Sequence, residues 1–164
     1  MRVFPRTMSS HSPTYVAQRT PPTLNRRSGS TAADAGSIGA EAVIGVGTGV
    51  EPGEYSLLSP LAALLDAELA ATRKVTDKGW APRARQVGIT GRSIAPRLYV
   101  ALGLSGKFNH MVGVRAAGTV LAVNSDPEAL VFGHADVGIV GDWHEVVPEL
   151  EAALRARSTR TGEP

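Results

Sequence analysis

The stretch QVGITGRSIAPRLYVALGLSGKFNH, residues 86–110, sets the pattern that decides the fold. It begins with a short apolar strand signal that runs into ITGRS, a turn rich in glycine and hydroxyl groups. The apolar run Leu98–Leu102 then leads into a second turn, Gly103–Gly106, with Asn109 and His110 just beyond it. Glycine turns bring backbone amides close to a ligand, and phosphate groups are common partners of such amides. The stretch therefore points to a phosphate-bearing ligand.

Other apolar segments of strand length lie on both sides of this stretch. We expect strands at residues 42–46, 85–88, 119–123 and 135–140. A helix is predicted from Ser59-Pro60, a common helix start, and another near Pro148. One helix face would carry Leu61, Leu64, Leu65 and Leu69, and an extended segment would follow at 70–75. Apolar strands alternating with helices predict an α/β fold, a single doubly wound, Rossmann-like parallel sheet.

The residues suited to ligand contact follow the predicted strands. In doubly wound sheets, ligands bind beyond the carboxyl ends of the strands. The sequence therefore predicts a ligand site at one edge of the sheet, although the G-x-G-x-x-G dinucleotide fingerprint is absent. The residues at these strand ends are Gly47, Gly88 to Gly91, Gly103 to Gly106, Asn124 and Asp142. Asp142 is equally a candidate N-cap for the final helix.

Composition excludes several other kinds of site. The chain of 164 residues has no cysteine, so disulfides, thiolate metal sites and cysteine nucleophiles are excluded. No apolar run reaches the ~18 residues that would span a membrane, so no membrane insertion is expected. The histidines show no metal-ligand spacing, and Ser93 and Ser105 have no visible histidine–acid partnership.

Residues 1–40 differ in composition from the rest. Ser, Thr, Pro and Arg dominate there, and residues 1–33 carry five arginines and no acidic residue. The remainder has 12 basic and 15 acidic residues, without the basic patch that nucleic-acid binding requires. We expect residues 1–40 to be a disordered leader or the remnant of a lost domain, since no amphipathic helix supports a transit peptide. Residues 156–164 are expected to be a flexible tail.

Several motifs together resemble one known family. They are ATRKVTDKGW at 71–80, QVGITGRSIAPRLYVALGLSGKFNHMVGV at 86–114, VLAVNSDPEALVF at 120–132 and ADVGIVGDW at 135–143. In this order they resemble the C-terminal FAD-binding domain of the electron-transfer flavoprotein alpha subunit, across residues 41–155. The sequence of residues 87–111 looks closer to actinobacterial paralogues of this subunit, including those associated with mycofactocin redox systems. The resemblance implies a DHS-like NAD/FAD-binding domain.

The resemblance also implies roles for the residues that match the family's motifs. Thr72 would contact FAD, and Arg73 would lie over the flavin and favour its anionic forms. The family's VGQTG appears here as Val87-Gly88-Ile89-Thr90-Gly91, in which Thr90 would hydrogen-bond near flavin N5. Ile89 stands where the family has glutamine, so one polar contact is lost.

The last matching motifs cover the diphosphate and adenosine ends. The family's SGxxQH appears here as Ser105-Gly106-Lys107-Phe108-Asn109-His110. It would hold the diphosphate, and His110 would donate to the flavin carbonyl at O2. Asn124 and Asp142-Trp143 match residues that hold the adenosine end.

Two departures from the family concern the beginning of the domain. The family's first turn reads GGRG, but here it is Gly47-Thr48-Gly49, so an arginine that reaches the diphosphate is missing. Loss of one charge-assisted hydrogen bond costs about 1.5–3 kcal/mol of binding. The family also has an N-terminal α/β domain, where only residues 1–40 precede this one.

We therefore expect an FAD-binding electron carrier rather than an enzyme with its own substrate, located in the cytoplasm. A dehydrogenase would supply electrons, a membrane quinone reductase or another carrier would accept them, and an electron-transfer flavoprotein beta-type subunit would complete a heterodimer. One alternative is a truncated, cofactor-free interaction module, favoured by Thr48, Ile89 and the absent first domain. Another is a domain that binds a different nucleotide, such as NAD.

Overall fold

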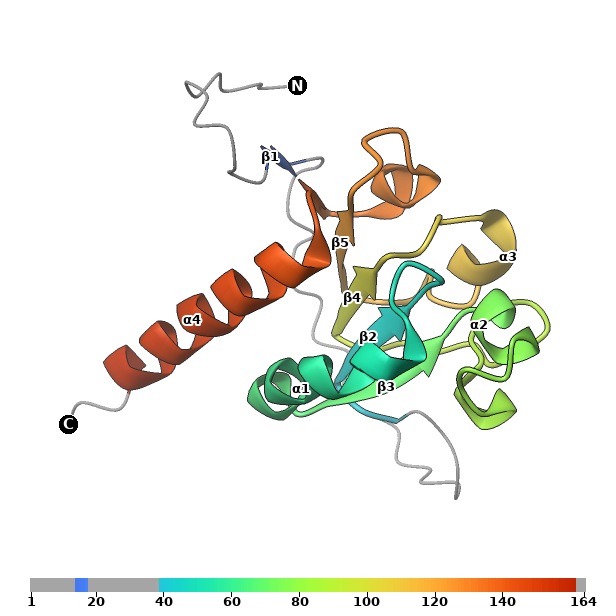
Figure 1. The fold of residues 1–164 in the computed structure, drawn as a ribbon, viewed down its shortest axis with the longest axis horizontal. Coiled ribbons are helices and arrows are strands. Elements are labelled where there is room, and N and C mark those ends of the chain that lie inside the picture. The colour runs from blue at the N-terminus through green and yellow to red at the C-terminus, as the bar shows by residue number, and fades with distance from the viewer. Residues whose placement is uncertain (1–13, 18–38, 162–164) are drawn as a thin grey trace.

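The computed structural model describes residues 14–17 and 39–161, which form one six-stranded sheet with helices on both faces (Figure 1). The strands lie in the order β1-β6-β5-β4-β2-β3. Their bounds are β1 Thr14–Ala17, β2 Ala42–Val46, β3 Ala67–Ala71, β4 Leu98–Leu102, β5 Thr119–Asn124 and β6 Val137–Val140. The helices are η1 Pro52–Leu58, α1 Ser59–Leu65, α2 Arg73–Asp77, η2 Arg83–Arg85, α3 Phe108–Met111, η3 Leu130–His134 and α4 Trp143–Thr161.

Strands β2 to β6 are parallel to one another, and only β1 runs antiparallel, against β6. β2 pairs with both β3 and β4, and the chain then continues outward through β5 and β6. The order of the strands therefore reverses between β2 and β4. This confirms the predicted doubly wound α/β fold and fixes its topological switch point.

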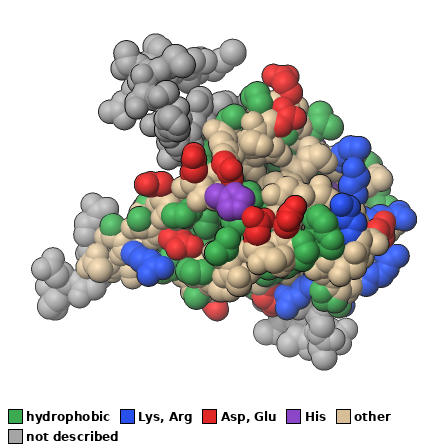
Figure 2. All heavy atoms as spheres, in the orientation of Figure 1, with side chains coloured by type: hydrophobic (Ala, Val, Ile, Leu, Met, Phe, Trp, Pro, Cys, Tyr) green, Lys and Arg blue, Asp and Glu red, His purple; other side chains and the backbone are tan. Residues whose placement is uncertain are grey.

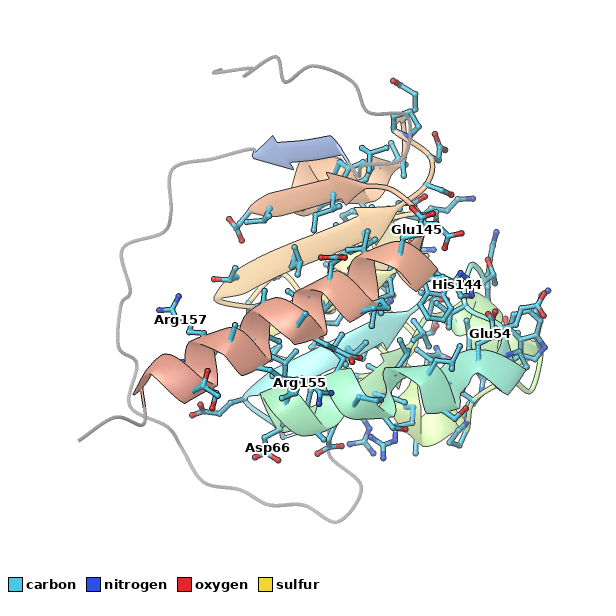
Figure 3. The ribbon with its side chains drawn as sticks, turned by 60° about the vertical axis from the view of Figure 1, so that its left-hand side comes forward. Glu54, Asp66, His144, Glu145, Arg155 and Arg157 are labelled. Atoms are coloured by element: carbon cyan, nitrogen blue, oxygen red, sulfur yellow. The ribbon has the colours of Figure 1, made fainter. Side chains whose placement is uncertain are left out.

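Each face of the sheet carries its own hydrophobic core. On one face α1 and α4 pack against the strands through residues such as Leu61 and Val146, and Figure 3 shows these two helices side by side. On the other face, α3, η3 and the loop between residues 86 and 97 supply Met111, Val131 and Ile94. Within the described ranges, no helix is long and apolar enough to cross a bilayer.

The predicted strand at 85–88 is wrong. Gln86 and Val87 form only isolated bridges, to Ala71 and Arg92. The next residue, Gly88, has a φ of 134°, and its carbonyl accepts the Gly91 amide at 3.0 Å. The chain therefore turns at once, and a strand of ordinary length cannot form.

The boundaries of the first helical region also differ from the prediction. Helical structure begins at Pro52, where Glu51 and Glu54 form a capping box, so Ser59 is not an N-cap. Asp66 ends α1 with a φ of 49°, and Leu69 consequently lies in β3 and not on a helix face. The segment expected to be extended at 70–75 divides into the end of β3 and the start of α2.

The two ends of the chain contain more regular structure than expected. Residues 14–17, inside the predicted leader, form β1, whereas residues 1–13 and 18–38 lie outside the described residues. The final helix begins before Pro148, at Trp143, and it continues to Thr161 through most of the predicted tail.

Candidate functional site

The turns that follow β2 and β4 meet at the switch point. The Gly49 amide donates to the Gly103 carbonyl at 3.0 Å, and the Gly47 amide donates to Leu102 at 3.0 Å. A Cβ on Gly47 would lie 2.2 Å from the Gly103 carbonyl oxygen, so only glycine allows this approach. The glycines of the first turn therefore serve to bring two loops together.

Two cavities, each of about 410 Å³, open at this edge of the sheet. They share Thr48 and Ser105, which lie where the two cavities adjoin. The main cavity is lined by Gly47, Thr48, Thr72, Arg73, Lys74, Asp77, Val87, Gly88, Ile89, Thr90, Leu104, Ser105, Gly106, Lys107, Asn109 and His110. The side cavity is lined by Thr48, Gly49, Gly103, Ser105, Asn124, Asp126, Glu128, Ala129 and Leu130.

Most of the predicted site residues line these cavities. Asn124 lines the side cavity, while Gly91, Phe108, Asp142 and Trp143 line neither. The predicted residues in the main cavity are Thr72, Arg73, Val87, Gly88, Ile89, Thr90, Ser105, Gly106, Lys107, Asn109 and His110. Sequence reasoning did not single out Lys74, Asp77 or Asp126 as site residues, because charged residues beside a turn are usually plain surface positions.

The loop from Ser105 to Lys107 offers backbone donors to the main cavity. Within the part of the chain that the structure describes, the amides of Ser105, Gly106 and Lys107 have no hydrogen-bond acceptor. Gly106 is buried and has a φ of 75°, a left-handed conformation that favours glycine. Successive free amides of this kind form a nest that suits an anionic group such as a phosphate.

Basic side chains surround the same cavity. Arg73 Nε donates to Asp77 Oδ2 at 3.2 Å, and Arg83 lies 3.6 Å from the other oxygen of Asp77. Lys74 and Lys107 also line the cavity, so its cations outnumber its single carboxylate. Figure 2 shows Lys and Arg gathered on the side of the molecule where Figure 1 places α2 and α3. The electrostatic environment favours an anionic ligand.

Thr90 is oriented by a buried glutamine. Gln86, which is 1% exposed, donates from Nε2 to Thr90 Oγ1 at 2.9 Å. Its Oε1 accepts from the Thr76 hydroxyl at 2.6 Å and from Arg83 Nη1 at 3.1 Å. A guanidinium only donates, so the bond from Arg83 fixes the direction of the amide. Because the Thr90 oxygen already accepts a hydrogen bond, its own O–H is available to donate to a ligand. Sequence reasoning did not predict a role for Gln86 at the site. The signal that could have indicated it is its polar side chain next to a glycine turn.

Gly91 supports this arrangement from outside the cavity. A Cβ on Gly91 would lie 2.3 Å from the Gln86 carbonyl oxygen, so the turn closes tightly on the residue that orients Thr90.

His110 is held by two protein groups. Nδ1 lies 2.9 Å from the Val87 carbonyl oxygen, and Nε2 lies 2.7 Å from the Tyr99 hydroxyl. A carbonyl only accepts, so Nδ1 carries the proton, and the Tyr99 hydroxyl donates to Nε2. Burial lowers the pKa of His110, partly offset by the bond to Val87, and burial raises the pKa of Tyr99. Both ring nitrogens are therefore engaged, and donation from Nε2 to a ligand would require this nitrogen to leave Tyr99 and to take up a proton.

Asn124 and Trp143 stabilise the loops around the side cavity. Asn124 Nδ2 donates to the Leu104 carbonyl at 2.9 Å, and its Oδ1 accepts the Asp126 amide at 2.9 Å. Trp143 is buried, and its indole Nε1 donates to the Gly49 carbonyl at 3.0 Å. Asp142 caps α4, because its Oδ1 accepts the His144 amide at 2.9 Å.

Comparison with known proteins gives the family. Residues 38–115 match the family model described as "Electron transfer flavoprotein FAD-binding domain". Protein FixB of Bradyrhizobium diazoefficiens is 44% identical over 119 residues, which cover 72% of this chain and 32% of that protein. Electron transfer flavoprotein subunit alpha of Mycobacterium tuberculosis is 43% identical over 116 residues, which cover 70% of this chain and 36% of that protein.

A eukaryotic relative has a similar match. The probable mitochondrial electron transfer flavoprotein subunit alpha of Caenorhabditis elegans is 40% identical over 116 residues, which cover 70% of this chain and 35% of that protein. The chain thus spans about a third of the length of the curated relatives that it matches. By these matches, residues 38–115 of the chain belong to the electron transfer flavoprotein FAD-binding domain family.

Proposed function

We propose that this chain binds FAD at the carboxyl edge of its sheet and serves as the flavin-carrying part of an electron carrier. The observation that carries the proposal is the pair of adjoining cavities at the switch point, with the free amides of Ser105 to Lys107 where they meet. A dinucleotide has two bulky ends joined by an anionic diphosphate, which suits two cavities with donors between them. The residues present therefore fit FAD.

The main cavity is proposed to hold the flavin end. FAD supplies the redox chemistry when it is bound, while the protein binds and orients it. Thr90 has an O–H free to donate, and Arg73 adds positive charge beside the ring, which favours electron density on the flavin. Thr72 and His110 line the same cavity. The loop from Ser105 to Lys107 would bind the diphosphate of FAD.

The side cavity is proposed to hold the adenosine end. Asn124, Asp126 and Glu128 line it, and their side-chain oxygens are acceptors for ribose hydroxyls or the adenine amino group. Residues 41–155 would then form the complete FAD-binding domain of this chain.

The partners belong to the same proposal. Relatives are named subunit alpha, which supports pairing with a beta-type subunit in a heterodimer. Ile89 and Phe108 are exposed on the loop and helix next to the main cavity, at 57% and 68%, so apolar surface lies where a second subunit could cover the flavin. A dehydrogenase as donor, a quinone reductase as acceptor and a cytoplasmic location complete the proposal.

The function is tested by titrating the purified full chain with FAD, FMN, riboflavin and NAD. We expect FAD to bind most tightly, because it alone presents a flavin, a diphosphate and an adenosine. Isothermal titration calorimetry and flavin fluorescence quenching measure the four dissociation constants. A chain that stays colourless and takes up no FAD, even with a beta-type subunit present, would overturn the proposal. Preferential binding of NAD would favour a nucleotide domain of another kind.

The Thr48→Arg variant should bind FAD about ten- to a hundredfold more tightly, because a charge-assisted hydrogen bond to a phosphate is worth about 1.5–3 kcal/mol. Thr48 lines both cavities, so an arginine there can reach the proposed diphosphate position. The gain should shrink as salt is raised. Calorimetric FAD titrations at two salt concentrations measure both effects.

The matched control is Ser56→Arg, which adds the same charge at an exposed position on η1 that lines neither cavity. If the two variants bind FAD with equal affinity, the diphosphate does not lie within reach of residue 48, and its proposed position where the two cavities adjoin is wrong.

A further inference from the structure

The start of α4 carries a histidine that joins two carboxylates from distant parts of the chain. His144 Nδ1 lies 2.6 Å from Asp142 Oδ1, and Nε2 lies 2.8 Å from Glu54 Oε1. Figure 3 shows His144 beside Glu54, which comes from η1. Ionised carboxylates only accept hydrogen bonds, so both ring nitrogens must carry protons. The contact therefore exists in this form only when His144 is an imidazolium.

Both carboxylates are themselves fixed by backbone. Glu54 Oε2 accepts the Glu51 amide at 2.9 Å in the capping box that begins η1. Asp142 Oδ1 accepts the His144 amide at 2.9 Å and caps α4. The imidazolium therefore ties η1, which follows β2, to the first turn of α4, which follows β6. Backbone hydrogen bonds therefore restrict the rotation of both carboxylate side chains that His144 contacts.

The link continues from His144 to the ligand site. The imidazole is stacked on the Trp143 indole, with ring centroids 3.8 Å apart and planes 28° apart. The same indole donates to the Gly49 carbonyl at 3.0 Å, and the Gly49 amide donates to Gly103. Gly49 and Gly103 line the side cavity. A change at His144 can therefore reach the wall of the site through two contacts.

We propose that His144 is a positioning residue that, when protonated, latches the start of α4 to η1 and thereby holds Trp143 and the Gly47–Gly49 turn in the shape that binds the nucleotide. We call Glu54, Asp142 and His144 the latch. An imidazolium also attracts the electron-rich face of the indole on which it stacks, so protonation strengthens the Trp143 contact as well as the two hydrogen bonds. The part of the proposal that concerns FAD rests on the proposed function.

The latch should hold over a defined range of pH. The hydrogen bonds that the His144 ring donates to Glu54 and Asp142 raise the pKa of His144, and hydrogen bonds from backbone amides and from His144 lower the pKa of both carboxyls. The histidine's contribution is complete below its ordinary value near 6.5 and is lost as pH rises through its raised pKa. The carboxylates' contribution is lost only as pH falls through their lowered pKa values.

The charges around the ring are all acidic. Besides Glu54 and Asp142, which it contacts, Glu145 follows it on α4 and Glu51 begins η1. Among the described residues, no lysine or arginine forms an ion pair with Glu54 or Asp142. His144 is consequently the cation on which the link depends.

The test compares the full wild-type chain with His144→Gln from pH 5 to pH 9, first without FAD. A stacked imidazolium quenches indole emission, so wild-type tryptophan fluorescence should rise through a midpoint above the ordinary histidine pKa, and His144→Gln should show no such transition. The protection factor of the Gly49 amide in hydrogen exchange should fall through the same midpoint in the wild type. FAD affinity should fall about threefold through it, a small effect because the charges are exposed.

Two further variants sharpen the test. Glu54→Gln keeps a residue that can complete the capping box but removes one charge, so the midpoint should move to lower pH. His134→Gln makes the same substitution at an exposed position on η3 outside both cavities, and it should retain the full wild-type transition.

The outcomes separate the latch from the proposed function. If fluorescence and Gly49 exchange depend on pH equally in the wild type and His144→Gln, the latch is overturned, whether or not FAD binds. If both signals follow His144 but FAD does not bind, the proposed function fails and the latch stands. If FAD binds with an affinity that is the same in both chains across the pH range, His144 does not position the nucleotide site.

Discussion

The Gly106→Ala variant should be less stable than the wild type by about 3 kcal/mol or more, because overpacking of this kind meets backbone that cannot move aside. A Cβ at this position would lie 2.0 Å from the Val131 amide nitrogen and 2.2 Å from its Cα. Gly106 also has a φ of 75°, which disfavours any residue with a side chain. Urea unfolding followed by circular dichroism measures the difference.

The same variant should lose FAD binding even where it remains folded. To relieve the contact, the loop from Ser105 to Lys107 must move away from η3, and the Val131 amide must leave the Ser105 carbonyl, which it reaches at 3.2 Å. That movement displaces the free amides proposed to bind the diphosphate. Titration of the folded variant with FAD, followed by quenching of flavin fluorescence, measures the loss of binding.

The control is Gly133→Ala on η3, the helix that Gly106 contacts. A Cβ on Gly133 has no heavy atom within 4 Å, and its φ is not in the left-handed range. Its stability and FAD affinity should match the wild type. If Gly106→Ala and Gly133→Ala unfold at the same urea concentration, the close approach of Gly106 to Val131 is not present in solution.

Tyr99→Phe should cost about 1–3 kcal/mol of stability, because it leaves a buried acceptor without its donor. Tyr99 is 0% exposed and His110 is 7% exposed, so water cannot replace the missing hydroxyl. Nε2 of His110 would then face an apolar ring. Chemical denaturation gives the free energy of unfolding.

A second tyrosine provides a matched control. The Tyr55 hydroxyl is buried and has no hydrogen-bond partner among the described residues. Tyr55→Phe removes an unsatisfied polar group, so its stability should equal or exceed that of the wild type. The opposite signs of two identical substitutions would show that the Tyr99–His110 contact, and not the loss of a hydroxyl as such, is responsible. Equal stability of Tyr99→Phe and wild type would contradict this contact.

The Tyr99–His110 contact also limits the role of His110 at the site. If His110 donates to the flavin when FAD binds, Nε2 must take up a proton, and Tyr99→Phe should make that easier because it removes the hydroxyl that donates to this nitrogen. If His110 instead only holds the Val87 turn, His110→Ala should weaken FAD binding without changing the flavin potential. A redox titration of both variants separates these two roles.

Much of the fold was predictable because whether a segment forms a strand depends largely on residues adjacent in the sequence. The runs at 42–46, 98–102 and 119–123 consist of apolar residues and glycine apart from Thr119, and each forms a strand at or within one residue of the predicted bounds. The segment at 85–88 was wrongly predicted as a strand because its apolar character extends over too few residues to form one. Gly88 turns the chain after two residues, and Gln86 is buried for its hydrogen bonds and not for strand pairing.

The position of the glycine turns was also predictable for a local reason. Every parallel strand places its carboxyl end at the same edge, so the glycine turns after β2 and β4 were expected at one edge of the sheet. The pairing of β2 with β4 is what brings these two turns together. Asp142 and Trp143 also follow a strand, but Asp142 caps α4 and Trp143 is buried in the core. The order of the strands alone does not predict these two roles.

The sequence by itself determined the strands, the glycine turns at one edge and the resemblance to a flavoprotein domain, because periodicity, turn chemistry and motifs are properties of short segments. Only the tertiary structure decided which of these segments meet. Gly49 contacts Trp143 across 94 residues of chain, and Glu54 contacts His144 across 90. Such pairs depend on the order of strands in the sheet, and that order brings the first turn and the last helix to one side of a single site.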